Sequence, residues 1–216
     1  MPVLDFFLDL LFPPKCPFCS ALLEEKGDLL CPDCQKSLPW LTGAAGEKKV
    51  ELTAGCVSPL GYRGRVPDAV HAYKFGGRSA RGRAFGALIA QCLRDRGLTA
   101  DLVTWPPLSA KRLRKRGYDQ AGLLAQAVGE ELGVPVAATL RKPRDNPAQS
   151  GLEDEGERRA NVLGAYVLRE GAEVAGKTVL LIDDVVTTGS TLSECAKVLR
   201  LGGAEKVLCA TLARAR

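Results

Sequence analysis

The stretch VLLIDDVVTTGST, residues 179–191, decides the fold because it joins a buried strand to a helix through a polar loop. Its apolar run ends in two adjacent acids, and a cluster of hydroxyls around Gly189 follows one further apolar pair. A short continuous apolar run is typical of a strand that is covered on both faces. The hydroxyl-rich loop then leads into a helix that we expect to begin near Ser190.

Two chemical demands meet in this loop. A helix N-terminus offers unpaired N–H groups and about half a positive charge, so it attracts anions, and Gly189 lets a ligand approach the backbone. The two acids accept hydrogen bonds from sugar hydroxyls but repel phosphate. A ribose 5-phosphate group meets both demands, whereas the alternative is a plain helix N-cap beside surface acids. The predicted contacts are Asp183, Asp184, Val185, Thr187, Thr188, Gly189, Ser190 and Thr191.

Strands and helices alternate over most of the chain. The strands are expected at 55–62, 101–105, 164–168, 178–184 and 206–213, and the helices at 83–93, 120–132 and 190–201. This alternation predicts an α/β fold with a mostly parallel sheet covered on both faces. Ligands of such sheets bind beyond the carboxyl ends of the strands, which is where the two acids occur.

Four of the eight cysteines form two CxxC pairs, CPFC at 16–19 and CPDC at 31–34. Each pair makes a tight knuckle, and two knuckles present four thiolates to one tetrahedral zinc. A redox CxxC or chance would be the alternatives, but a redox motif normally occurs once, beside a βαβ pattern. We therefore predict a structural zinc site formed by Cys16, Cys19, Cys31 and Cys34.

The composition divides the chain near residue 50. Residues 41–50, LTGAAGEKKV, indicate a linker. We therefore expect a zinc module with a short N-terminal helix at 1–50 and a larger domain at 51–216, so that loss of zinc would unfold the module alone. The chain of 216 residues is long enough for one sizeable core.

Charge and hydropathy limit the class of protein. A net charge of +5 suits a ligand rich in phosphate. No apolar run approaches the roughly 18 residues that a membrane span needs. The N-terminus also lacks the basic start of a secretory signal. We expect a cytoplasmic protein without a membrane span.

The quoted loop resembles the loop with which type I phosphoribosyltransferases bind phosphoribosyl pyrophosphate (PRPP). Over nearly the whole chain, five motifs in order resemble the ComF family: CPFC…CPDC, HAYKFGGR, PPLSAKRLRKRGYDQA, QSGLEDEGERRANVLGAY and IDDVVTTGST. The resemblance implies a zinc module fused to a phosphoribosyltransferase domain that uses PRPP with Mg²⁺. It also implies a role around DNA uptake or use in bacteria.

The resemblance assigns roles to basic residues as well. Phosphoribosyltransferases carry their pyrophosphate loop where PPLSAKRLRKRGYDQ occurs, so Arg112, Arg116 and Gly117 are candidate pyrophosphate contacts. Lys74 stands beside a Gly-Gly turn that would cradle phosphate. A nucleic-acid patch, a solvated surface and a plain turn remain alternatives. Residues 149–161 resemble the mobile loop that closes over the active site, and no role is assigned to His71.

The implied reaction is departure of pyrophosphate from PRPP, which leaves an oxocarbenium-like ribosyl centre. Asp183 and Asp184 would hold the ribose hydroxyls and balance the developing positive charge. Purine-salvage relatives carry an acid three residues after the second of the pair, but Thr187 occupies that position here. The acceptor is therefore left open.

Three functions fit the sequence. The first is a phosphoribosyltransferase that acts on an unidentified acceptor. The second is a non-catalytic module that binds PRPP or a nucleotide and works through competence proteins such as a helicase. The third is a single-stranded-DNA-binding protein that uses the zinc module and the basic patch. A match to the P-loop pattern, GAEVAGKT at 171–178, is set aside because it precedes a strand rather than a helix.

Overall fold

The computed structural model describes residues 13–25, 27–75, 80–143 and 163–215. Three expectations lie outside these residues: the short helix before residue 13, the turn at 76–78 after Phe75, and the loop 149–161.

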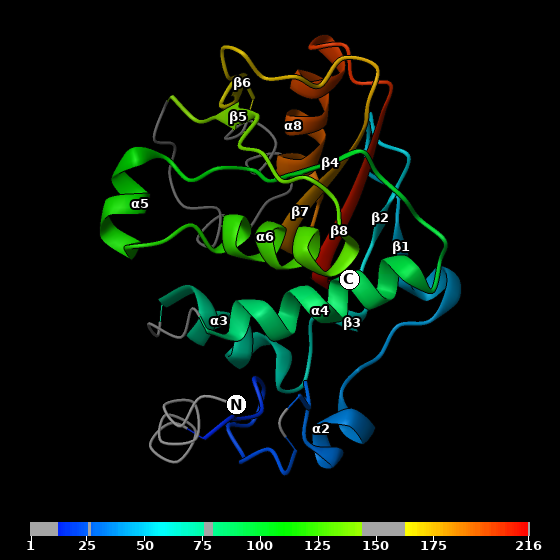
Figure 1. The fold of residues 1–216 in the computed structure, drawn as a ribbon, viewed down its shortest axis with the longest axis vertical. Coiled ribbons are helices and arrows are strands. Elements are labelled where there is room, and N and C mark those ends of the chain that lie inside the picture. The colour runs from blue at the N-terminus through cyan, green and yellow to red at the C-terminus, as the bar shows by residue number, and fades with distance from the viewer. Residues whose placement is uncertain (1–12, 26, 76–79, 144–162, 216) are drawn as a thin grey trace.

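A six-stranded sheet forms the centre of the larger domain (Figure 1), in the order β1–β2–β8–β7–β4 with β3 paired to β8. Its two long strands, β7 (Thr178–Val186) and β8 (Lys206–Arg214), run parallel to each other over nine residues. β4 (Leu102–Thr104) pairs with β7 in the same direction. The prediction of a mostly parallel α/β sheet is confirmed.

The edge beyond β8 differs from the expectation. The strand expected at 55–62 is interrupted at Ser58-Pro59, and its two halves, β2 (Cys56–Val57) and β3 (Leu60–Gly61), each pair with β8. Proline has no N–H to donate to a ladder, so the strand is broken there. β1 (Glu47–Lys48) pairs antiparallel with β2, and η1 (Gly43–Gly46) precedes it. Residues 47–48 therefore belong to the sheet and not to a linker, while the division of the chain near residue 50 stays a prediction.

The strand expected at 164–168 lies outside the main sheet. β6 (Val167–Leu168) pairs antiparallel with β5 (Leu140–Arg141) in a separate two-stranded sheet. The P-loop-like segment connects β6 to β7, so it joins two strands as predicted.

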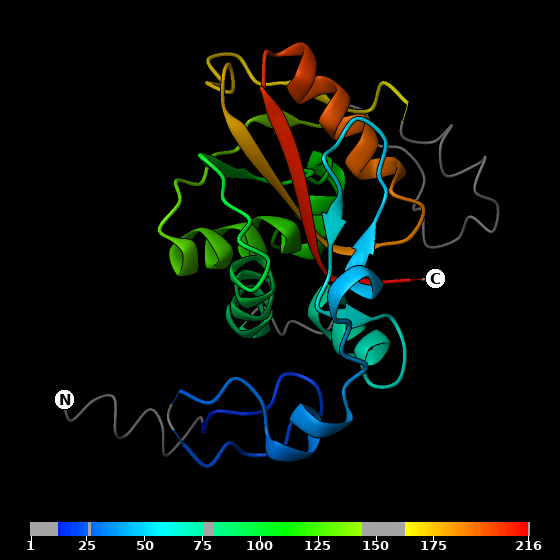
Figure 2. The same ribbon diagram turned by 90° about the vertical axis from the view of Figure 1, so that its right-hand side faces the viewer.

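Helices cover both faces of the sheet (Figure 2). α4 (Arg81–Arg94) and α6 (Gln120–Leu132) lie on one face, and α8 (Ser190–Leu201) lies on the other. All three helices were predicted. α6 begins where Asp119 accepts a hydrogen bond from the N–H of Gly122 and ends at Gly133, which has a φ of 66°.

Two helices in the described part of the larger domain were missed. α3 (Val66–Phe75) buries Val66, Ala69, Val70 and Tyr73, whose spacing of three, four and seven residues is the pattern of a helix face. α5 (Ala110–Arg116) replaces the expected basic loop, and its N-cap Ser109 accepts a hydrogen bond from the N–H of Arg112.

The cysteine-bearing segment forms a small lobe that packs under α3 and α4 (Figures 1 and 2). Its only regular helix among the described residues is α2 (Pro32–Ser37). Its buried residues belong to the same core cluster as α3, α4 and α6. Loss of the small lobe would therefore also expose apolar surface of the larger domain, in contrast to the expected independence of the two parts.

α4 and α6 cross without space for one extra methyl group. A Cβ at Gly86 would lie 2.3 Å from the Cβ of Ala127, so Gly86→Ala forces the helices apart. We expect a loss of about 1–3 kcal/mol in the free energy of unfolding, measured by urea denaturation. Arg83→Ala, on the exposed side of α4, is the matched control. Equal stability of the two variants would contradict this packing.

Candidate functional site

A cleft of about 790 Å³ opens at the carboxyl end of β7, between α3, α5 and the loop that precedes α8. The structure brings nearly all predicted contacts into it: Lys74, Arg112, Arg116, Asp183, Asp184, Val185, Thr187, Thr188, Gly189, Ser190 and Thr191. Gly117 is the exception, because it ends α5 with a φ of 82° and does not line the cleft. α3 and the loop before α8 are more than 100 residues apart in the sequence, and they meet because parallel strands place their ends at one edge.

The loop before α8 has the form of an anion site. The hydroxyls of Thr188 and Ser190 lie 2.7 Å apart, and the Ser190 N–H donates to Thr188 Oγ1. Gly189 adopts a φ of 86° and provides no side-chain cap. The first N–H groups of a helix have no carbonyl partner within the helix, and here the N–H of Ser190 is taken up by the Thr188 hydroxyl.

Gly189 is required for a reason that differs from the one expected. A Cβ at this position would lie 3.0 Å from Cγ2 of Val50, so a side chain would crowd the core. A side chain would also be strained at this φ. A branched residue at position 189 would therefore destabilise the folded chain even without a ligand.

Asp184 forms a buried ion pair with α3. Its Oδ1 lies 2.7 Å from Nζ of Lys74, and its side chain is 5% exposed. Burial lowers the pKa of Lys74, but the nearby Asp184 carboxylate outweighs that effect and the net pKa is raised. The other carboxylate oxygen, Oδ2, is buried and has no hydrogen-bond partner among the described residues. One oxygen of the site is thus left for a ligand or its cation.

Asp183 lies in a different environment. Successive side chains of a strand point to opposite faces. Burial raises the pKa of Tyr166 and of Cys195 in α8, on the side away from α3, and the nearby Asp183 carboxylate adds to both shifts. Its Oδ1 accepts the N–H of Asp184 at 2.8 Å. Burial, and next the Asp184 charge, raise the pKa of Asp183 above its usual range. The two acids therefore differ in their surroundings: a lysine neutralises Asp184, whereas Asp183 is partly buried beside another carboxylate.

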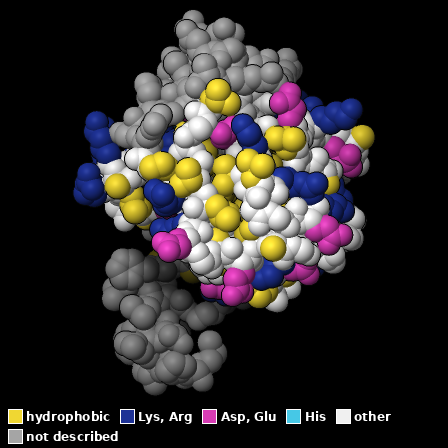
Figure 3. Space-filling view, turned by 90° about the horizontal axis from the view of Figure 1, so that it is seen from above, with side chains coloured by type: hydrophobic (Ala, Val, Ile, Leu, Met, Phe, Trp, Pro, Cys, Tyr) yellow, Lys and Arg dark blue, Asp and Glu magenta, His cyan; other side chains and the backbone are white. Residues whose placement is uncertain are grey.

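α5 and α3 form a basic wall. Lys115 lines the cleft beside Arg112 and Arg116. The Arg116 guanidinium lies 4.7 Å from the centre of the Phe75 ring and donates to the side chain of Gln120. Burial lowers the pKa of Arg116, although the Asp184 charge opposes this effect. The face seen in Figure 3 intersperses acidic and basic side chains.

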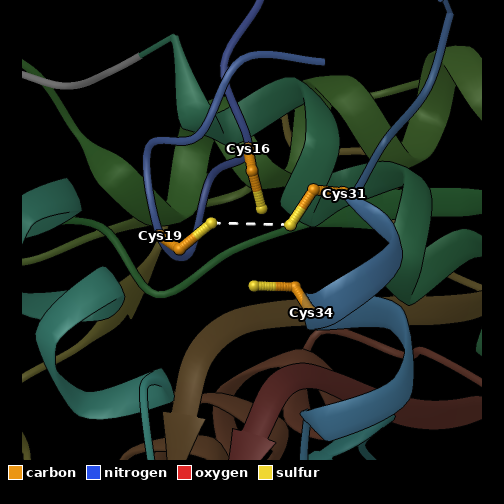
Figure 4. A group of neighbouring side chains, drawn as sticks. All are labelled: Cys16, Cys19, Cys31 and Cys34. Atoms are coloured by element: carbon orange, nitrogen blue, oxygen red, sulfur yellow. Dashed lines mark hydrogen bonds between the residues drawn. The ribbon is translucent and has the colours of Figure 1, made fainter. Parts of the chain in front are cut away.

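The four cysteines of the small lobe converge on one point (Figure 4). Their sulfur atoms all lie within 4.8 Å of one another, and those of Cys19 and Cys31 are 3.5 Å apart. Tetrahedral zinc with bonds of about 2.3 Å places its sulfurs about 3.8 Å apart, so this set fits the metal. Arg65 donates to the sulfur of Cys34, the kind of outer contact that orients a thiolate ligand.

Comparison with known proteins supports both the cysteine cluster and the domain that carries the cleft. A double zinc ribbon domain matches residues 7–48, and a phosphoribosyl transferase domain matches residues 114–216. Competence protein F of Haemophilus influenzae is 30% identical over 94% of this chain and 85% of its own length. The chain belongs to the ComF family.

A second curated relative matches this chain over a similar length, and a solved structure matches part of it. The DNA utilization protein YhgH of Salmonella typhimurium is 31% identical over 91% of this chain and 90% of its own. The solved structure of glutamine PRPP amidotransferase from B. subtilis is 23% identical, covers 64% of this chain and 29% of that one, and has a TM-score of 0.42. In the described part of this ComF-family chain, no helix is long and apolar enough to cross a membrane.

Sequence reasoning missed several residues of the cleft. Tyr62, His71, Tyr118, Lys142 and Tyr166 all line it. Tyr118 and Tyr166 occur inside the motifs RGYDQ and GAYVL, which were recognised for their charges and their strand pattern rather than for their aromatic rings. Lys142, which directly follows the unpredicted strand β5, approaches the Tyr166 ring to 4.9 Å.

Zinc should bind at one ion per chain. Replacing Cys16 and Cys34 by serine should abolish metal binding, because two of four thiolates are lost and structural zinc contributes roughly 10–16 kcal/mol to folding of such modules. Metal analysis of the purified protein measures this. Cys92→Ser, which alters a buried cysteine of α4 outside the cluster, should retain the ion. Wild-type protein without bound metal would contradict the assignment.

The Lys74–Asp184 pair should behave as a coupled unit. Lys74→Met leaves a buried carboxylate unpaired, which typically costs 3–5 kcal/mol, and about 1–3 kcal/mol is expected here because Lys74 is 25% exposed. Adding Asp184→Asn should restore part of that stability. A double-mutant cycle in urea measures the coupling, and additive effects of the two changes would contradict the ion pair.

Proposed function

We propose that this protein binds PRPP with Mg²⁺ in the cleft and transfers its phosphoribosyl group to an acceptor, in the service of DNA uptake or use. One observation carries the proposal: a helix N-terminal hydroxyl loop, two carboxylates and a basic wall meet in a single cleft. The match to a phosphoribosyl transferase domain supports the ligand. The names of the relatives, Competence protein F and DNA utilization protein, support the role.

Each part of the ligand has a counterpart in the cleft. The 5′-phosphate goes to the loop at Thr187–Thr191 and the N-terminus of α8, and the ribose hydroxyls go to the two acids. The diphosphate faces the basic wall. The lining carries five cationic side chains, Lys74, Arg112, Lys115, Arg116 and Lys142, against Asp183 and Asp184. This net positive charge favours a ligand with several phosphates over a neutral sugar.

The transfer breaks the bond between ribose C1 and the diphosphate oxygen, and the electron pair leaves with the diphosphate. A lone pair of the acceptor forms the new bond at C1. Asp183 and Asp184 stabilise the positive charge on the sugar, and the basic wall stabilises the departing diphosphate. Mg²⁺ prefers oxygen ligands such as these carboxylates and phosphates, and when bound it would neutralise charge on the leaving group.

A second candidate function follows from the presence of Thr187 where purine-salvage relatives carry an acid. An acceptor that must lose a proton needs a base, and no acid occupies position 187. Of the two carboxylates in the described lining, Lys74 already neutralises Asp184, which leaves Asp183 and His71. This favours, as the alternative, a module that binds PRPP or a nucleotide without transfer and works through partners such as single-stranded DNA or a helicase of the competence machinery. Release of pyrophosphate from PRPP across a panel of acceptors distinguishes the two: binding without release indicates the module.

Asp183→Asn tests the ligand and the electrostatics together. Loss of a charged hydrogen-bond acceptor is worth about 1.5–3 kcal/mol, so the affinity for ribose 5-phosphate should fall at least about tenfold in calorimetry. Glu173→Gln, on an exposed side chain remote from the cleft, is the control. If the wild-type protein binds neither PRPP nor ribose 5-phosphate in the presence of Mg²⁺, the proposed function is wrong.

The same variant should be more stable than the wild type when no ligand is present. Because the pKa of Asp183 is raised in the folded state, the folded protein holds more protons than the unfolded one at any pH between the ordinary and the raised pKa. The wild type therefore loses stability as the pH rises through this range. Asparagine does not titrate. The gain should reach about 1 kcal/mol or more at pH 8, since a pKa change of 1 corresponds to about 1.4 kcal/mol. It should shrink as the pH falls towards about 4, and thermal unfolding measures it.

A further inference from the structure

An aromatic chain leads from the zinc knuckle to the cleft. Phe18 lies between the first two cysteines, in CPFC, and is only 6% exposed. Its ring centre is 5.3 Å from that of Phe85 in α4. Phe85 in turn packs edge-on against Tyr73 of α3, at 5.5 Å. Phe85 and Tyr73 are both fully buried, so neither ring can shift without moving its neighbour.

Tyr73 connects this chain to two walls of the cleft. Its hydroxyl donates to the backbone carbonyl of Gln120 at 2.7 Å, at the start of α6. Its own carbonyl accepts the hydroxyl of Tyr118. The next residue, Lys74, forms the ion pair with Asp184. The position of one buried ring therefore determines where a cation and a tyrosine of the cleft lie.

A second contact ties the small lobe to the same helix. One guanidinium nitrogen of Arg81 donates to the hydroxyl of Ser20, and the other donates to the carbonyl of Ala69 in α3, each at 3.3 Å. Ser20 directly follows the CPFC knuckle. Both the aromatic chain and this bridge thus start at the metal-binding turn and end on α3.

We propose that zinc in the Cys16, Cys19, Cys31 and Cys34 site is a positioning element for the cleft. The metal holds the knuckle closed and keeps Phe18 against Phe85. Through Tyr73 this contact fixes Lys74, Tyr118 and the start of α6 in their ligand-binding arrangement. Without the metal the four sulfurs lose their common partner, Phe18 leaves Phe85, and α3 loosens. This coupling goes beyond the proposed function, because it applies to any anion that the cleft binds.

Amide hydrogen exchange on the full-length protein tests the coupling without a ligand. Removing zinc with a chelator should speed exchange at 66–75 and 118–122 at least about tenfold and leave 192–199 of α8 unchanged. Phe18→Ala, which keeps all four cysteines, should give the same pattern while metal analysis still finds zinc. Leu22→Ala, in the same lobe but 60% exposed, is the control and should change nothing.

Several results would overturn the proposal. Unchanged exchange at 66–75 after zinc removal would show that the lobe and the cleft are independent. Faster exchange throughout the chain would show a loss of global stability rather than a specific path. If Phe18→Ala does not fold, Phe18→Leu keeps an apolar side chain but removes the ring contact, and normal exchange at 66–75 in that variant would equally contradict the coupling.

Ligand affinity supplies the second measurement. Zinc-free protein should bind ribose 5-phosphate about 5–20-fold more weakly, and by thermodynamic reciprocity ribose 5-phosphate should tighten zinc binding by the same factor. Equal affinities with and without zinc would refute the proposal even if exchange changes. If zinc-loaded wild type does not bind ribose 5-phosphate at all, the proposed function fails, and the exchange experiment still decides the coupling.

Discussion

Burying a carboxylate at the end of a strand costs free energy unless a cation lies within reach, and this constraint organises the cleft. Asp184 meets it through Lys74, which comes from a helix more than 100 residues earlier in the chain. The pair draws the C-terminal turn of α3 to the edge of the sheet. The aromatic residues around Tyr73 hold that turn in place from below.

Asp183 and Asp184 are adjacent in one motif, but only one of them has a cation beside it. Asp184 is neutralised inside the protein, whereas Asp183 is partly buried with a raised pKa and faces the layer of α8. Keeping one carboxylate in an unfavourable environment lowers the stability of the fold, a cost that functional sites commonly carry. The identical residue types in the sequence conceal this difference, because it arises from the neighbours on each face of the sheet.

The sequence predicted the parts whose signals are local. The two acids near the end of β7, the hydroxyl loop after it, the paired CxxC knuckles and the three long helices all follow from spacing within about twenty residues. α3 carried an equally regular pattern, but the Gly-Gly turn beside it drew the interpretation towards a loop. The break between β2 and β3 has a local signal in Pro59, which the apolar pattern around it masked. The separate β5–β6 sheet and the cleft tyrosines depend on contacts between distant segments, which periodicity does not report. Gly117 was assigned from resemblance alone, and it lies outside the cleft lining.

Val50 lies at the point where the composition suggests cutting the chain in two. Its side chain packs directly against Gly189, below the loop that begins α8, and it belongs to the core cluster on the α8 side of the sheet. A shortened protein that began at residue 51 would lose strand β1 and the side chain that packs against the loop before α8. The fragment 51–216 looks like a complete domain in the sequence, but it would be damaged at the candidate site. If this fragment failed to bind a ligand, the truncation would be the cause, and the result would not apply to the full-length protein.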